Sequence, residues 1–160
     1  PFFNNLVPYG IGNGISSDAI GAALFVSTAM SIIGPISASM LIDKVDRSHA
    51  IFGALTVQIL IILSFTGEIT WIGFMLRAIC FQMAWNFVGP FLMGMIAAVD
   101  RSGNYSVMIP ASQLGGISIG HAVIASLLNS GNPSLINYYS GSFIALSILI
   151  YFVLFRNRSE

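Results

Sequence analysis

Two long apolar runs without a formal charge constrain this chain more than any other feature. Ala19–Ile42 is 24 residues long and Ser48–Gly67 is 20, and neither contains Asp, Glu, Lys or Arg. At about 1.5 Å of rise per residue, a helix of either length crosses a hydrocarbon core about 30 Å thick. Between the two runs, Asp43–Arg47 carries four charges in five residues. These segments together predict a membrane hairpin whose turn is the charged pentapeptide.

The composition excludes several classes of protein. Only 8% of the residues are charged and 56% are hydrophobic, whereas about 25% of the residues of a soluble domain are charged. The net charge of zero argues against a broad basic surface for nucleic acid. Cys80 is the only cysteine, so no disulfide forms within the chain, and no residue spacing is typical of a metal site. We therefore expect an integral membrane protein with no metal and no cofactor.

Five complete transmembrane helices fit the sequence, which predicts an all-α polytopic bundle. Lipid cannot satisfy open backbone groups, and no alternation typical of a membrane barrel is present. The expected spans are 19–42, 50–65, 71–99, 105–128 and 135–155, within a region that covers residues 16–160. Segment 1–15 is too short to cross and resembles the outer part of a truncated helix, so we expect a fragment of a longer protein. The long third span favours a tilt or a break at Gly89-Pro90.

Basic residues are distributed unevenly over the loops. Five spans place the 43–49 loop, the 100–104 loop and the C-terminal tail on one side of the membrane. That side holds five of the six Lys and Arg residues, namely Lys44, Arg47, Arg101, Arg156 and Arg158. The opposite loops contain only Asp18 and Glu68. The positive-inside rule therefore predicts that the C-terminus is cytoplasmic, in a plasma or inner membrane.

Two ionisable side chains lie inside the expected spans. Arg77 is about two turns into the third span, where a charge costs about 2.5 kcal/mol or more and usually faces a cavity or a partner. It could bind a substrate or take part in gating, or it could snorkel outward and pair with Glu68. His121 is at a similar depth in the fourth span and could carry a proton or bind a ligand. Its simpler interpretation is a neutral histidine bonded to a neighbouring helix.

Polar and amphipathic side chains also occur near the middle of the spans and on the N-terminal segment. Gln82 and Asn86 are four residues apart and share one face of the third span. Each amide alone is more typical of contact between helices than of a binding site. Taken together, they predict a polar pathway whose candidates are Arg77, His121, Gln82, Asn86, Trp85, Gln113, Asn4, Asn5 and Tyr9.

Residues Gly116–Gly120 match the pattern Gly-x-Ser-x-Gly and are followed by His121. A serine nucleophile of this kind needs a strained turn between a strand and a helix, with its histidine distant in the sequence. Here Ser118 and His121 are three residues apart in an expected helix. An intramembrane hydrolase is therefore the weakest interpretation, and we expect no enzymatic activity.

The charged loop belongs to a longer pattern. Ser39–Arg47 resembles the loop signature Gly-x-Leu-x-Asp-Arg-x-Gly-Arg of the major facilitator superfamily. Leu41, Asp43 and Arg47 match that signature, and Lys44 replaces its arginine conservatively. Serine and aspartate stand where the family has glycines. Asp100–Asn104 resembles a later cytoplasmic loop of the same family, Asp-x-Ser-Gly-Arg, with asparagine in place of the arginine.

The resemblance covers the whole chain and implies the C-terminal half of a twelve-helix transporter. The N-terminal segment would be the outer part of helix seven, and the five spans would be helices eight to twelve. Such a half pairs with an N-terminal six-helix half of the same protein and works by alternating access to a midplane site. By analogy, helices seven, eight, ten and eleven face the cavity, and these helices carry the candidates named above.

Helix electrostatics suggest a role for the loop. Asp43 is expected at the C-terminal end of a helix, where the helix dipole disfavours an anion by about 0.3–1 kcal/mol. It should therefore seek Lys44, Arg47 or the N-terminus of another helix. If that helix belongs to the missing half, the loop would act as a latch between access states. We assign this role to Asp43, Lys44, Asp46 and Arg47, with Asp100 and Arg101 in the second loop.

The sequence predicts secondary active transport of a small solute, coupled to a proton or ion gradient. Arg77 would suit an anionic solute. No carboxylate lies deep in the spans, so a coupling proton would be carried by His121 or by the missing half. The alternative is a non-transporting membrane protein such as a receptor or channel subunit. A channel would favour a repeated filter or a ring of polar residues.

Overall fold

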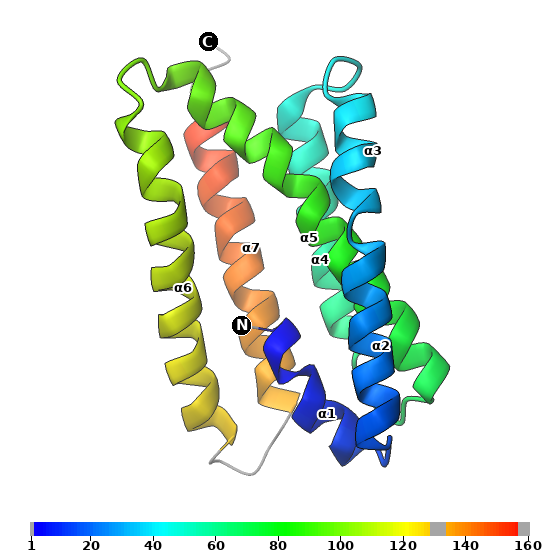
Figure 1. The fold of residues 1–160 in the computed structure, drawn as a ribbon. Coiled ribbons are helices and arrows are strands. Elements are labelled where there is room, and N and C mark those ends of the chain that lie inside the picture. The colour runs from blue at the N-terminus through cyan, green and yellow to red at the C-terminus, as the bar shows by residue number, and fades with distance from the viewer. Residues whose placement is uncertain (1, 129–133, 157–160) are drawn as a thin grey trace.

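The chain forms a bundle of long helices in its computed structural model, which describes residues 2–128 and 134–156. Every regular element in these two ranges is a helix (Figure 1). In order, these elements are η1 Phe3–Asn5, α1 Leu6–Gly12, α2 Ser17–Met30, α3 Ile33–Leu41, α4 Arg47–Ser64, α5 Trp71–Val99, α6 Asn104–Leu128 and α7 Ser134–Arg156. The predicted all-α fold is confirmed.

Five helical segments are long and apolar enough to cross a membrane. They cover Ser17–Leu41, Arg47–Ser64, Trp71–Val99, Asn104–Leu127 and Leu135–Val153. Each expected span overlaps one of these segments, and all of their ends agree within three residues. The first segment consists of α2 and α3 together. The prediction of a membrane-spanning helical protein is therefore supported by both the length and the composition of these helices.

Of the two alternatives for the long third span, a tilt or a break at Gly89-Pro90, the break does not occur, because α5 continues through Pro90 as one helix. The length of α5 is accommodated by an oblique course across the bundle (Figure 1). A break occurs instead in the first span, between α2 and α3. Pro35 has no N–H to donate to the carbonyl of Ser31, and the N–H of Gly34 bonds that carbonyl instead, at 3.0 Å. This tighter turn interrupts the α-helical pattern.

Helix α5 is the centre of the bundle. It packs along α2, α3 and α4, and α7 packs against α4. The larger hydrophobic core lies where α1, α2, α4 and α5 meet, and Phe65, Phe74 and Ile20 are among its fully buried side chains. By contrast, α6 makes few contacts with the other helices. Its side chains are exposed over 104–119 except at Ile109.

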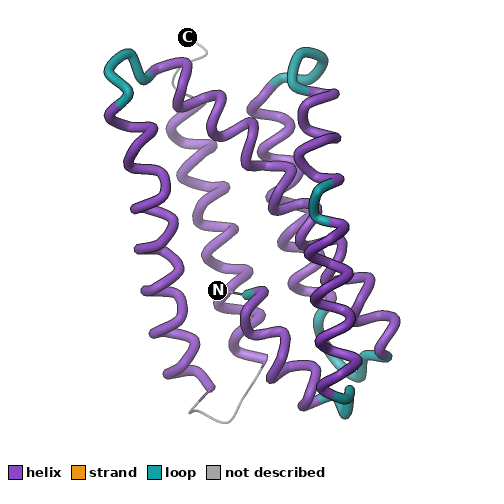
Figure 2. The backbone as a smooth tube through the Cα atoms, in the orientation of Figure 1, coloured by secondary structure: helices purple, strands orange, loops and turns teal. Residues whose placement is uncertain are grey.

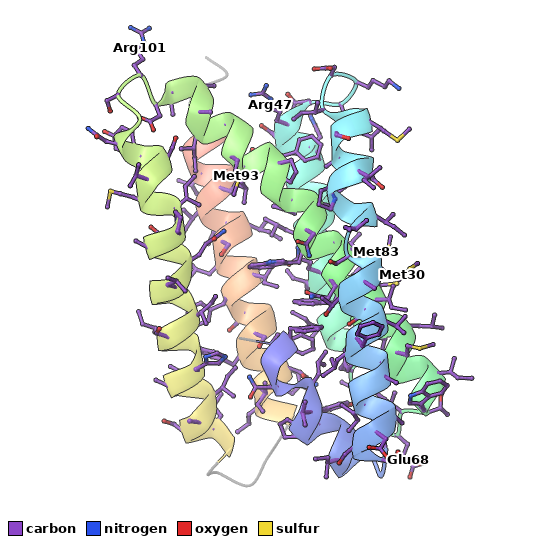
Figure 3. The ribbon with its side chains drawn as sticks, viewed as in Figure 1. Met30, Arg47, Glu68, Met83, Met93 and Arg101 are labelled. Carbon is purple, nitrogen blue, oxygen red and sulfur yellow. The ribbon has the colours of Figure 1, made fainter. Side chains whose placement is uncertain are left out.

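Both predicted basic loops lie at one end of the bundle. The 43–46 turn, the 100–103 turn and the C-terminal end of α7 are together in Figure 2. Figure 3 shows Arg47 and Arg101 at this end and Glu68 at the opposite end. Arg158 and the side chain of Arg156 lie outside the described residues. The helical topology therefore groups the loops as expected, while the compartment that they face stays a prediction.

Candidate functional site

Arg77 is half-buried on α5, about two turns from the start of the helix. Its guanidinium carbon is 5.9 Å from the centroid of the buried Phe65 ring, within the range of a cation–π interaction. The positive charge also interacts electrostatically with the phenol of Tyr9. The Tyr9 ring packs edge-on against Phe65, with the two ring centroids 5.6 Å apart. The predicted pairing with Glu68 is not made, because Glu68 is exposed and no ion pair joins the two. An aromatic face therefore holds this cation in place of a carboxylate.

The aromatic cluster around Arg77 is fixed by two asparagines. Asn137 on α7 is buried, and its Nδ2 donates to the carbonyl of Phe65 at the end of α4. Asn13 donates from Nδ2 to the carbonyl of Tyr9 at 2.9 Å and accepts at Oδ1 from the N–H of Ile69 at 3.3 Å. Segments that are more than 50 residues apart in the sequence are thereby held around Arg77.

The polar side chains in the middle of α5 lie on two different faces of the helix, with Gln82 and Asn86 on one face and Trp85 on another. Asn86 donates from Nδ2 to the backbone carbonyl of Gln82 at 2.9 Å, so one of its donors is used within the helix. Both amides are half-buried on the shared face that their spacing predicted. Trp85 is 52% exposed and lies on an outer face of the helix. The structure thus keeps the predicted amide pair together but separates it from the indole.

Helix α6 carries Gln113 and His121 at different levels. Gln113 is exposed and lines a groove between α5 and α6. His121 is half-buried in the second half of α6, which ends at the end of the bundle where α5 begins (Figure 1). Ser118 donates from Oγ to the carbonyl of Leu114 at 2.9 Å within the continuous helix. The strand-to-helix turn of a nucleophile elbow is therefore absent at this described position.

Of the candidates on the N-terminal segment, Tyr9 packs against the large core. Tyr9 packs on Phe65 from α1, and Asn5 is half-buried at the end of η1. The side chain of Asn4 lies outside the described residues. Sequence reasoning overlooked Asn137, Gln58 and Ser140, although all three are polar residues inside expected spans and buried in the structure. The signal that selected Gln82 would also have selected these residues.

The first loop uses a different carboxylate from the one expected. Asp46, not Asp43, caps α4 by accepting from the N–H groups of Ser48 at 2.9 Å and His49 at 3.1 Å. The backbone hydrogen bond from His49 is the main cause of the lowered pKa of Asp46. The imidazole of His49 adds a contact from Nδ1 at 3.0 Å.

The basic residues of this loop do not pair with Asp43. Arg47 donates from Nη1 to the carbonyl of Gly94 on α5 at 3.2 Å, and Lys44 is exposed. Asp43 forms no ion pair with a residue that the structure describes. The expected partners of Asp43 within its own loop are therefore wrong, and the loop is attached to α5 through Arg47.

The second loop is organised by Asp100. Its Oδ2 accepts from both the N–H and the Oγ of Ser106, each at 2.7 Å, and its Oδ1 accepts from Ser102 Oγ at 3.3 Å. Desolvation is the largest single effect and raises the pKa of Asp100. The hydrogen bonds from Ser106, Tyr105 and Ser102 together outweigh it and lower the pKa to about 2. Asp100 thus ties the turn to the first residues of α6, while Arg101 points away from the bundle (Figure 3).

No group of three or more His, Cys, Asp or Glu residues in the described ranges could hold a metal ion. Comparisons with protein-family models, with curated proteins and with solved structures found no match. The resemblance to the major facilitator superfamily therefore rests on the two loop motifs, and it stays a prediction.

Proposed function

We propose that this chain is part of a secondary active transporter that moves a small solute across a membrane by alternating access. The observation that carries the proposal is the half-buried Arg77 inside an apolar helix, without a carboxylate partner among the described residues. A charge in a membrane span is expensive and is typical of substrate pathways, ion pathways and gates. Five apolar helices and the two loop motifs support the same interpretation.

Arg77 has two roles open to it in this proposal. Its guanidinium could bind an anionic group of the solute, or it could form a gating contact that exists in one access state. The contact with Phe65 fits both roles. An aromatic face attracts the guanidinium and fixes its position without neutralising its charge, so the cation remains able to bind an anion.

The basic loops, at the opposite end of the bundle, form the proposed cytoplasmic side of the transporter. We assign this end to the cytoplasm by the positive-inside rule, in a plasma or inner membrane. Arg47 fixes the first loop to α5, so that exposed Asp43 and Lys44 remain accessible to a second half of the protein. That second half would be the six-helix partner implied by the motifs. A coupling proton would be carried by His121 or by a residue of that half.

Solute uptake by the full-length protein tests this function. Proteoliposomes would be given a mixture of small solutes under an imposed pH gradient, and the retained solutes would be identified by mass spectrometry. We expect Arg77→Ala and His121→Ala each to reduce uptake at least tenfold. Glu68→Gln, which removes an exposed charge in the loop before α5 and changes no pathway or latch residue, serves as the control and should retain uptake within about twofold. Equal uptake by all four proteins would remove Arg77 and His121 from the pathway.

A further inference from the structure

A groove of about 640 Å³ separates the second half of α5 from the first half of α6. The two helices leave the short 100–103 turn and diverge along the bundle (Figure 1). The groove is lined by Gly89, Leu92, Met93, Ile96, Val99, Tyr105, Met108, Ile109, Ser112 and Gln113. Its volume is within the range of about 300–1,000 Å³ that small-molecule sites occupy.

The lining chemistry selects against a charged ligand. None of the ten lining residues is Asp, Glu, Lys, Arg or His, and most of the lining is aliphatic or methionine. A buried charge without a partner or a hydrogen bond is strongly disfavoured at such a surface. Met93 on α5 and Met108 on α6 both line the groove, and their flexible thioether side chains adapt to irregular apolar shapes. Figure 3 shows Met93 well away from Met30, which lies on α2.

Gln113 provides the directional contact in this groove. Its exposed amide has no hydrogen bond to any residue in the described part of the chain. The neighbouring Ser112 already donates from Oγ to the carbonyl of Met108 at 2.9 Å and so can only accept another hydrogen bond. A ligand that bears a carbonyl or amide on an apolar body would therefore satisfy Gln113. A lipid acyl chain has no group that could form a hydrogen bond with this amide.

We propose that the α5–α6 groove binds an uncharged, largely apolar small molecule through Met93 and Met108, with a carbonyl or amide of that molecule hydrogen-bonded to Gln113. The identification of this molecule as the transported solute rests on the proposed function. Gly89 is twelve residues beyond Arg77, which is about 18 Å along the helix. One small molecule in the groove cannot contact Arg77, so this inference assigns Arg77 the gating role.

Photolabelling of the full-length protein in phosphatidylcholine nanodiscs tests the groove. The probe is benzophenone, which is neutral and apolar and offers one carbonyl. Saturable labelling is expected in both lining segments, 89–99 and 105–113. Gln113→Leu should reduce the labelling about fivefold, by the loss of one hydrogen bond, and Met93→Ala should reduce it severalfold. The matched control Met30→Ala removes another exposed methionine, 40% exposed on α2, and should leave the labelling unchanged.

Two further probes identify the occupant. We expect the anion 4-benzoylbenzoate to label the groove at least tenfold less than benzophenone does. A phosphatidylcholine with a photoreactive acyl chain should label the groove weakly and be displaced by benzophenone. Labelling by the lipid that benzophenone does not displace, non-saturable labelling that includes the Met30 segment, or unchanged labelling in Gln113→Leu would each overturn the proposal.

The same nanodisc preparation separates this inference from the proposed function. Site-specific labelling by a protein that accumulates no solute in proteoliposomes would contradict transport but leave the binding site standing. Gradient-driven uptake by a protein whose groove is not labelled would contradict the groove alone. Arg77→Ala should impair uptake and leave benzophenone labelling intact.

Discussion

Gly34 is the residue on which the close crossing of α3 and α5 depends. A Cβ added at this position would lie 2.5 Å from the carbonyl oxygen of Met83 and 2.9 Å from the backbone nitrogen of Phe87. Both obstacles are backbone atoms of α5, so no side-chain rotation can relieve them. Small residues allow membrane helices to approach in this way. Gly34 thus allows the backbones of α3 and α5 to come into direct contact.

We predict that Gly34→Ala lowers the free energy of unfolding by about 1–3 kcal/mol, the usual effect of inserting volume into a packed interface. Unfolding in detergent by increasing sodium dodecyl sulfate, followed by circular dichroism, measures this change. The matched control is Gly53→Ala on α4, where an added Cβ meets no atom within 4 Å. Equal stability of the two variants would contradict the close crossing.

Asp100 gives a pH dependence at the N-terminal end of α6. Its pKa in the folded chain is about 2, below the ordinary value of 3.8. The ionised form is therefore favoured by folding, and its contribution is present above about pH 4 and is lost as the pH falls from about 4 to about 2. We expect faster hydrogen exchange at 104–108 over this pH window, after correction for intrinsic rates.

Asp100→Asn should exchange rapidly at 104–108 at every pH, because the amide oxygen is a weaker acceptor for the N–H and Oγ of Ser106. Asp43→Asn is the control, since the exposed Asp43 forms no described ion pair. A wild-type exchange rate at 104–108 that does not change between pH 4 and pH 2 would refute the role of Asp100.

At the scale of the helices, the spans could be predicted because uncharged runs of sufficient length have few alternatives to a membrane helix. Their contacts could not be predicted from the same pattern. The start of α4 at Arg47, three residues before the expected Ala50, makes Asp46 the N-cap residue. Asp46 therefore binds the N-terminus of α4, and Arg47, which was an expected partner of Asp43, donates to Gly94 instead. The break occurs at a different proline from the one considered, because Pro90 is tolerated within α5 whereas Pro35 interrupts the first span.

The contact between α7 and the end of α4 is another helix contact that could not be predicted from the sequence pattern. Asn137 and Phe65 are 72 residues apart, and no local pattern links them. We predict that Asn137→Ala lowers the free energy of unfolding by about 1–2 kcal/mol, because a buried backbone carbonyl loses its donor. The same detergent titration measures it. Asn86→Ala removes an amide that donates within its own helix and should cost less, and a larger loss in Asn86→Ala would contradict the assignment.

At the scale of the whole molecule, the polar features are separated along the bundle axis. Arg77 and its aromatic cluster lie near the start of α5, and the groove and the 100–103 loop lie toward the other end of this helix. Membrane helices were predictable from the sequence, and so was the grouping of the basic loops. The groove was not, because Gln113 was selected only as a polar residue and its apolar neighbours come from two helices. The proposed division of roles between Arg77 as a gate and the groove as a binding site rests on this separation.

Dependence of solute accumulation on an ion gradient tests the central claim most directly. Full-length protein in proteoliposomes would be supplied with the solute found by the uptake screen, with and without an imposed pH or sodium gradient. A secondary transporter should concentrate the solute above its external level only while the gradient lasts, and it should equilibrate the solute after an ionophore collapses the gradient. Rapid equilibration that no gradient can drive uphill would indicate a channel, and the absence of any flux would indicate a non-transporting membrane protein; either result would contradict the account.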